Sequence, residues 1–162
     1  MQIAIISDTH MPRGLRRIPG ACVERLVAAD SVIHAGDFVR LSVVRELQAY
    51  CELIAVQGNV DEYDVRVELP ETNDVEVGGA TIAVIHDAGP AQGRLERLRR
   101  RFPDADAVVF GHSHEPLHER APDGFQIFNP GSPTERRRAP HHTMGMAKAE
   151  NGKLTFELLA LD

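Results

Sequence analysis

Seven side chains that could bind a metal ion follow five apolar segments of this chain, each close to the point where the segment ends. The most distinctive stretch is Gly111-His112-Ser113-His114, which places two imidazoles one residue apart directly after the segment 106–110. On its own, such a pair fits an exposed turn as well as a metal site. The same arrangement recurs after segments 3–6, 31–35, 53–56 and 81–85, and this recurrence favours a metal site. The seven donors are Asp8, His10, Asp37, Asn59, His86, His112 and His114.

The chemistry of this donor set indicates transition metals. Carboxylate and amide oxygens combined with imidazole, in the absence of thiolates, suit manganese first, with nickel, iron, cobalt and zinc as alternatives. Seven donors exceed the four of a structural zinc site, so we expect two divalent ions that share one carboxylate, about 3.5 to 4 Å apart. Asp8 and Asp37 offset only two of the four positive charges. The remaining charge suits a hydroxide and a phosphate ester, and such a pair would lower the pKa of a bridging water.

The elements that carry these donors read as strands of a parallel sheet. Segments such as 3–6 are continuously apolar rather than alternating, which is typical of strands buried on both faces. Helical spacing of apolar residues predicts short helices over 22–30 and 41–50, between the first three strands. This alternation of strands and helices implies right-handed crossovers, which bring the carboxyl ends of the strands to one edge. The donors should meet in the crevice at that edge.

The second half of the chain predicts more antiparallel pairing. We interpret 61–73 as a connection, and Gly78-Gly79 as the turn of a hairpin between 74–77 and 80–85. A helix is expected over 91–102, with its arginines forming a solvated face. Hairpins are also expected between 116–120 and 125–128, and between 143–149 and 153–159.

Composition limits the class of protein. A chain of 162 residues suits one domain, 1–162. Its net charge of −6 argues against sequence-independent binding of nucleic acid. Cys22 and Cys51 lie within expected elements, so we expect no disulfide and a reducing compartment. The amino terminus lacks a leader pattern and no segment approaches a membrane span, so the expectation is a soluble cytoplasmic protein. A homo-oligomer stays open at this point.

In their order along the chain, these motifs resemble the calcineurin-like metallophosphoesterase superfamily. They are Asp8-x-His10, Gly36-Asp37, Gly58-Asn59-x-Asp61, His86 and Gly111-His112-Ser113-His114, followed by Asn129-Pro130-Gly131-Ser132. The absence of long insertions makes the chain most similar to the small single-domain phosphodiesterases of that superfamily. The resemblance implies an α/β fold of two packed β-sheets flanked by helices, an αββα sandwich. It assigns Asp8, His10 and His114 to the first metal and Asn59, His86 and His112 to the second, with Asp37 as the bridge.

The activity that this resemblance implies is hydrolysis of small phosphodiesters by a metal-bridging hydroxide. Asp37, Asn59 and Asp61 are the expected catalytic residues, with Asn59 and Arg136 as substrate contacts. Asp61 would orient a ligand histidine, a task that backbone carbonyls could perform equally well. The alternatives are a phosphomonoesterase or nucleotide hydrolase with the same centre, and a non-catalytic scaffold of the same fold. No ligand is missing, which disfavours the scaffold.

Some positions depart from the pattern or have another interpretation. Val60 stands where many superfamily phosphatases carry a histidine thought to protonate the leaving group, so that general acid is excluded and activated diesters would suffer least. Asp87 replaces a usual glycine, for which we favour a steric or electrostatic tuning role. His34 should satisfy a hydrogen bond beneath the site, and His118 has no evident role. The basic loop with Arg136, Arg137, Arg138, His141 and His142 is interpreted as solvated, with phosphate binding as the alternative.

Overall fold

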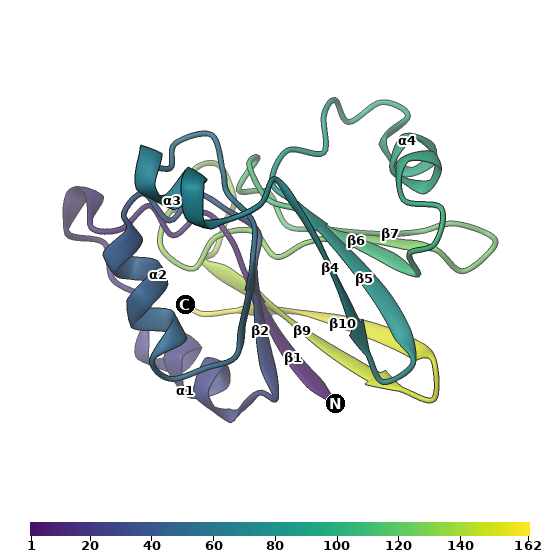
Figure 1. Cartoon of the computed structure of the whole chain (residues 1–162), viewed down its shortest axis with the longest axis horizontal. Coiled ribbons are helices and arrows are strands. Elements are labelled where there is room, and N and C mark those ends of the chain that lie inside the picture. The colour runs from purple at the N-terminus through teal and green to yellow at the C-terminus, as the bar shows by residue number, and fades with distance from the viewer.

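Two five-stranded β-sheets pack face to face, and helices cover their outer faces (Figure 1). The computed structural model describes all 162 residues. The expected αββα sandwich is therefore confirmed. None of its α-helices combines the length and the apolar character needed to cross a bilayer.

The first sheet holds three parallel strands and an antiparallel hairpin. β1 (Gln2–Ile6), β2 (Ser31–His34) and β3 (Leu53–Ala55) run parallel, with α1 (Gly20–Ala28) and α2 (Leu41–Gln48) as their connections. β9 (Thr143–Glu150) and β10 (Lys153–Ala160) pair with each other, and β9 pairs antiparallel with β1. The strand order is β10-β9-β1-β2-β3, so the end of the chain completes the sheet that its beginning starts.

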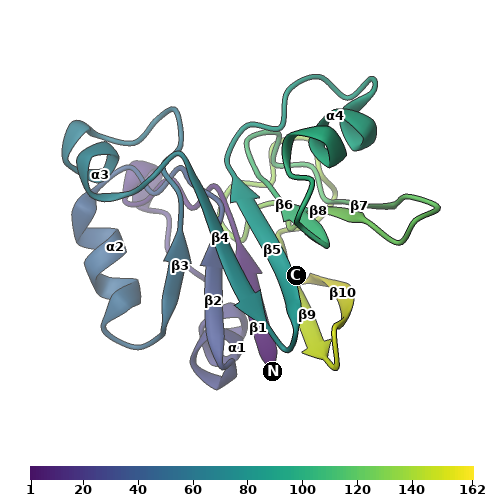
Figure 2. The same ribbon diagram turned by 45° about the vertical axis from the view of Figure 1, so that its right-hand side comes forward.

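The second sheet has the order β4-β5-β6-β8-β7. Its central strands, β5 (Ala80–Ile85), β6 (Ala107–Val109) and β8 (Gln126–Asn129), are parallel. The outer strands, β4 (Thr72–Val77) and β7 (Leu117–Arg120), are antiparallel to their neighbours. The helix α4 (Arg94–Arg101) connects β5 to β6, as Figure 2 shows. The second half of the chain is thus less uniformly antiparallel than its hairpin signals indicated.

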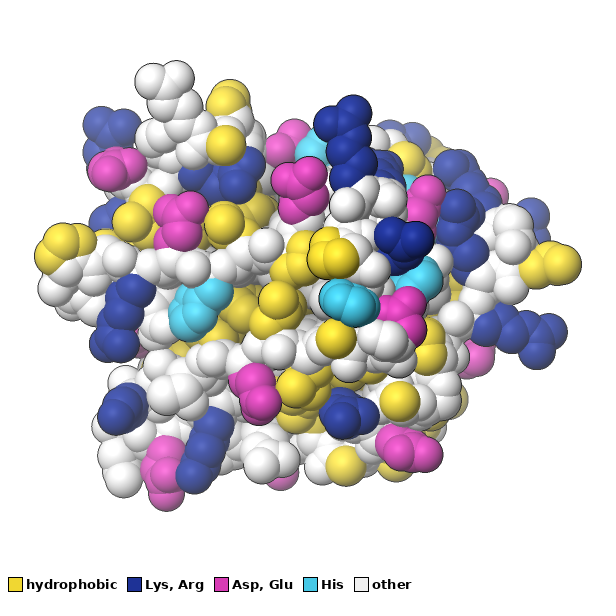
Figure 3. Space-filling view, turned by 180° about the vertical axis from the view of Figure 1, so that it is seen from behind, with side chains coloured by type: hydrophobic (Ala, Val, Ile, Leu, Met, Phe, Trp, Pro, Cys, Tyr) yellow, Lys and Arg dark blue, Asp and Glu magenta, His cyan; other side chains and the backbone are white.

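Three apolar layers hold the sandwich together. Side chains such as Ile5, Val84 and Phe128 fill the space between the two sheets. A second layer lies between the first sheet and α1 and α2, and a third lies between the second sheet and α4. Because β1 and β2 are buried on both faces, their sequences are apolar with little alternation, whereas β9 and β10 alternate between buried and exposed residues. On the surface, basic and acidic side chains are interspersed with hydrophobic ones on the face seen in Figure 3.

Two short helices lie outside the predicted elements. The 3₁₀ helix η1 (Arg13–Leu15) lies in the expected loop after β1. The helix α3 (Tyr63–Glu68) lies in 61–73, so the prediction of a plain connection there was wrong. The sequence gives little sign of α3, because Val65 is its one buried residue and six residues are too few for a periodic pattern.

Candidate metal centre

All seven predicted donors lie together, at the carboxyl ends of three parallel strands of the first sheet and two of the second, rather than at the edge of a single parallel sheet as expected. Asp8 and His10 follow β1, Asp37 follows β2 and Asn59 follows β3, while the remaining donors follow β5 and β6. The structure groups six of them into two clusters whose ligand atoms lie within 4.8 Å of one another. The first cluster is Asp8, His10 and His114, and the second cluster is Asp37, His86 and His112.

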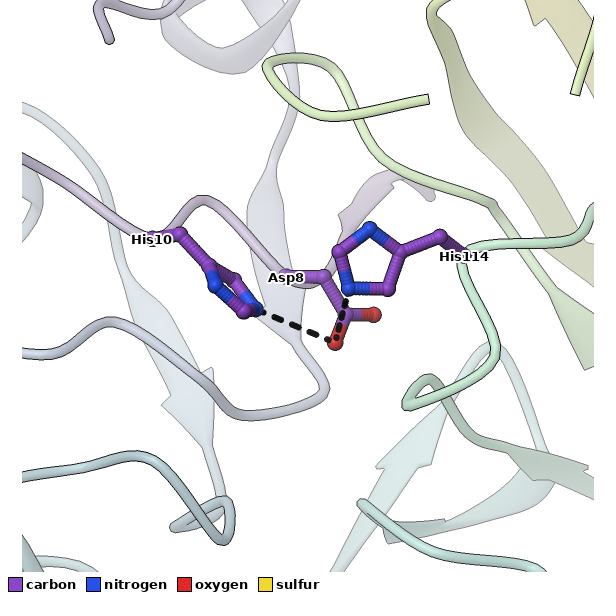
Figure 4. Close-up of side chains that lie close together, drawn as sticks. All are labelled: Asp8, His10 and His114. Carbon is purple, nitrogen blue, oxygen red and sulfur yellow. Dashed lines mark ion pairs between the residues drawn. The ribbon is translucent and has the colours of Figure 1, made fainter. Parts of the chain in front are cut away.

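In the first cluster, both imidazoles point toward one carboxylate (Figure 4). Asp8 Oδ1 lies 3.9 Å from His10 Nε2 and 3.4 Å from His114 Nε2. Both Nε2 atoms are buried and have no hydrogen-bond partner. A buried nitrogen without a partner is costly, so two of them aimed at one carboxylate fit a site for a cation.

In the second cluster, Asp37 lies between the two sets of histidines. Its Oδ2 atom is 3.2 Å from His86 Nε2 and 3.3 Å from His10 Nε2, a histidine of the first cluster. Asn59 Oδ1 lies 2.9 Å from His86 Nε2 and 3.0 Å from His112 Nδ1. One carboxylate oxygen thus faces both clusters, and Asn59 adds an amide oxygen to the second.

The backbone at these donors is unusual. Five of the seven donors have a positive φ between 47° and 70°, a region that residues with a Cβ rarely adopt. They are Asp8, His10, Asp37, His112 and His114. Strained backbone of this kind gathers at functional sites, where the surrounding structure enforces it.

Two glycines allow the loops to approach so closely. A Cβ on Gly58 would lie 2.1 Å from Asp37 Oδ1, and a Cβ on Gly111 would lie 2.7 Å from Asp8 Oδ2. Any side chain at these positions would therefore displace a carboxylate of the centre.

Backbone carbonyls orient two of the histidines. His86 Nδ1 lies 2.7 Å from the carbonyl oxygen of Ala35, and His114 Nδ1 lies 2.5 Å from that of Glu135. When Nδ1 donates its proton to a carbonyl, the lone pair of the ring is left on Nε2, which faces the centre. The structure thus shows backbone carbonyls, rather than Asp61, orienting these two histidines.

Glu135 is a residue of the site that sequence reasoning missed. Its carboxylate Oε2 lies 3.2 Å from His10 Nδ1, and its Oε1 lies 3.1 Å from Arg16 Nη2. Glu135 therefore contacts one histidine of the first cluster with its side chain and His114 with its carbonyl. It lies three residues after Ser132, whose hydroxyl donates to Asp8 O at 2.8 Å and accepts from Glu135 N at 2.9 Å. This proximity to a motif is the signal by which the sequence could have indicated Glu135.

The predicted role of Asp61 needs a correction. Its carboxylate, 3% exposed, accepts hydrogen bonds from the backbone N–H groups of Asp37 at 3.2 Å, Val39 at 2.7 Å and Gly58 at 2.7 Å. It therefore fixes the two loops that carry Asp37 and Asn59 rather than orienting a histidine. Burial raises the pKa of Asp61, and these N–H groups oppose that shift.

The substrate contact of Arg136 stays a prediction. Its guanidinium donates to the carbonyl of Ala139 at 2.8 Å, within its own loop. The neighbouring Arg137 instead donates to the carbonyl of His112 at 3.3 Å and is exposed beside the centre. The basic loop is thus partly anchored to the site rather than entirely solvated.

The remaining sequence interpretations fare differently. His34 bonds to Thr9 Oγ1 at 3.1 Å beneath the site, as predicted. The arginines of α4 do not form a purely solvated face, because Arg94 and Arg97 donate to carbonyls of the loop 88–92. The exposed Asp87 accepts from Gly89 N at 2.8 Å, and its tuning role stays a prediction. The side chain of His118 contacts Gln126, and both cysteines are free.

The electrostatics of the centre favour positive charge. Burial lowers the pKa of His10, but the adjacent carboxylates of Asp37 and Asp8 outweigh it and raise the value to about 9. The pKa of His86 is raised by Asp37 in the same way, against its burial. The pKa of Asp37 is lowered by both histidines although burial opposes this. The carboxylates thus stabilise the kind of charge that a divalent cation would supply.

Comparisons with known proteins agree with this geometry. Residues 1–152 match the calcineurin-like phosphoesterase superfamily domain. The chain is 30% identical to a probable metallophosphoesterase of Methanothermobacter thermautotrophicus, over 98% of this chain and 92% of that protein. It is 31% identical to a phosphodiesterase of Methanocaldococcus jannaschii, over 81% of this chain and 83% of that protein. A crystal structure of a Vps29 variant from Entamoeba histolytica shares the fold, with a TM-score of 0.79, 22% identity and full coverage of both chains. The chain therefore belongs to the calcineurin-like phosphoesterase superfamily.

Proposed function

We propose that this protein is a divalent-metal-dependent phosphodiesterase with a binuclear centre. The observation that carries the proposal is the position of Asp37 Oδ2, within 3.3 Å of a histidine from each cluster. The partnerless Nε2 atoms of the first cluster support it as well. The name of the M. jannaschii relative supports diesters as the substrate class. Manganese is the proposed metal, because mixed oxygen and imidazole ligands suit it.

The residues of the chain divide the work of holding the centre. Asp8, His10 and His114 would hold one cation, and Asn59, His86 and His112 the other, with Asp37 shared between them. When bound, such cations lower the pKa of water and neutralise charge on a phosphoryl group. Asp8 and Asp37 leave a net positive charge, which favours a phosphodiester anion.

The substrate would be held by groups at the rim. Asn59 directs its Oδ1 at His86 and His112, which leaves its amide N–H groups free to donate to a phosphoryl oxygen. In the reaction, a water oxygen bonds to phosphorus, the bond from phosphorus to the leaving alcohol breaks, and a proton from that water ends on the alcohol. Val60 has no proton to give, and its backbone N–H is bonded to Asp37 Oδ1 at 3.0 Å. Good leaving groups should therefore react fastest.

The test is hydrolysis of an aryl phosphodiester after loading with manganese or nickel, between about pH 6 and 9. The matching aryl phosphomonoester serves as the comparison, because both release the same phenol. We expect turnover above metal-only controls and a higher kcat/KM for the diester. Absence of turnover, despite bound metal measured by elemental analysis, would contradict the proposed activity. A preference for the monoester would replace it with a phosphomonoesterase.

We also propose a cytoplasmic location. Both Cys22 and Cys51 are free, in keeping with a reducing compartment. Fractionation of cells that produce the protein, followed by immunodetection, tests this.

A further inference from the structure

A cavity of about 290 Å³ opens beside the second cluster and includes Asn59 and His86 in its lining. Larger cavities elsewhere in the molecule contain no residue of either cluster. A substrate whose phosphoryl group reaches the second cluster therefore places neighbouring atoms in this cavity. The side chains that line the cavity should determine which chemical groups of a substrate bind there.

Two arginines stand on the walls of this cavity. Arg66 belongs to α3 and Arg101 ends α4, and these helices lie on opposite sides of the ends of β4 and β5 in Figures 1 and 2. Both side chains are exposed, and neither forms an ion pair within 4 Å, whereas Arg45 and Arg99 each pair with a carboxylate. Two guanidinium groups without carboxylate partners can bind an anion such as phosphate bidentately.

The same cavity carries two acidic side chains, Glu71 and Asp87. They balance the two arginines in formal charge, so the cavity does not attract anions by net charge alone. Carboxylates can accept hydrogen bonds from hydroxyl groups. The lining includes one hydrophobic residue and no Phe, Tyr or Trp, so it offers no platform for stacking a nucleobase and little surface for an acyl chain.

Building on the phosphodiesterase function proposed above, we propose that this cavity binds the alcohol part of the substrate and that this part is a phosphorylated polyol. The arginines bind its phosphate and the carboxylates accept from its hydroxyls. The diester group lies at the second cluster. The substrate thus carries two phosphoryl groups, one that reacts and one that is recognised.

The test measures binding, so it does not depend on turnover. Isothermal titration of the manganese-loaded protein compares glycerol 3-phosphate, with one phosphate, and glycerol 1,3-bisphosphate, with two. We expect the bisphosphate to bind at least about ten-fold more tightly, because a charge-assisted contact contributes on that scale. Arg66→Gln and Arg101→Gln should each remove most of this advantage and leave the dissociation constant of the monophosphate within about two-fold. Arg100→Gln, an exposed change on the same helix but outside the cavity, should leave the advantage intact.

Equal affinity for the two probes in the unaltered protein would overturn the proposal, as would an advantage that survives both arginine substitutions. If Arg100→Gln lost the tighter binding of the bisphosphate to the same degree, the proposal would also be overturned. The preference would then come from the overall charge of the region and not from the cavity. Hydrolysis of the aryl phosphodiester by the same preparation is recorded separately. A protein that hydrolyses the diester but shows no bisphosphate preference keeps the proposed function and loses this substrate class. A protein with the preference but no hydrolysis loses the proposed function and keeps only a binding site for a phosphorylated polyol.

Discussion

Replacement of Asp61 should destabilise the fold in proportion to the number of its hydrogen bonds that each substitution removes. Oδ2 accepts from the backbone N–H groups of Asp37 and Gly58, and Oδ1 accepts from that of Val39. Asp61→Ala leaves three buried donors without a partner. A hydrogen bond to a charged group contributes about 1.5 to 3 kcal/mol, and the desolvation of the carboxylate offsets part of the sum. We therefore expect a loss of about 3 to 6 kcal/mol, a large share of the 5 to 15 kcal/mol of a typical domain.

Asp61→Asn supplies the second step of the series. Its amide oxygen can replace Oδ2 and keep two of the three bonds, while its NH₂ group then faces the N–H of Val39. The expected loss is about 1.5 to 3 kcal/mol, and this variant stays measurable even where Asp61→Ala does not fold.

The assay is urea unfolding of the metal-free protein, followed by circular dichroism. Asp104→Ala is the control, because Asp104 is exposed and should change stability by less than about 0.5 kcal/mol. A loss below about 1 kcal/mol for Asp61→Ala, or a larger loss for Asn than for Ala, would refute the reasoning.

Three further predictions concern the centre and its support. Asp37→Asn should reduce the metal content at both clusters together, measured by elemental analysis, and two retained equivalents would contradict a shared carboxylate. Glu135→Gln should weaken metal binding at the first cluster by about 10- to 100-fold in a calorimetric titration, whereas the exposed control Glu115→Gln should not. Burial lowers the pKa of His34 to about 3 in the folded protein, below the ordinary 6.5, so its contribution to stability is complete above pH 6.5 and is lost as the pH falls toward 3. Between pH 7.5 and pH 5, the free energy of unfolding of the metal-free protein should therefore fall by about 2 kcal/mol more than that of His34→Gln. Parallel pH profiles of the two proteins in urea unfolding would disprove this.

The positions of the donors could be predicted because they depend on local pattern. Apolar segments without alternation indicate strands buried on both faces, and parallel strands expose their carboxyl ends at one edge. That rule gathers the donors of each sheet, but the approach of His10 to His114 also requires the two sheets to pack face to face, because β1 and β6 belong to different sheets. The hairpin over 143–160 was also visible in the sequence, but its pairing with β1 was not, because no local signal states which edge of which sheet a hairpin joins.

The residues that support the donors could not be predicted in the same way. Glu135 is one charged residue in a polar loop, and its contact with His10 exists only when the loops after β8 and β1 meet. Asp61 lies in a recognisable motif, but its three backbone partners come from two separate loops. Arg97 resembles any other arginine of a charged helix, yet it holds the carbonyls of the loop after His86. Each of these roles arises from tertiary contact rather than from spacing.

The left-handed backbone at five of the donors has an evolutionary consequence. Each such residue costs on the order of 1 kcal/mol or more, and glycine would adopt the same conformation without that cost. Selection for stability alone would therefore favour glycine at positions such as Asp8 or His112, which would make the protein more stable and chemically inert. A lineage that needed the fold but not the centre could gain stability by losing these donors.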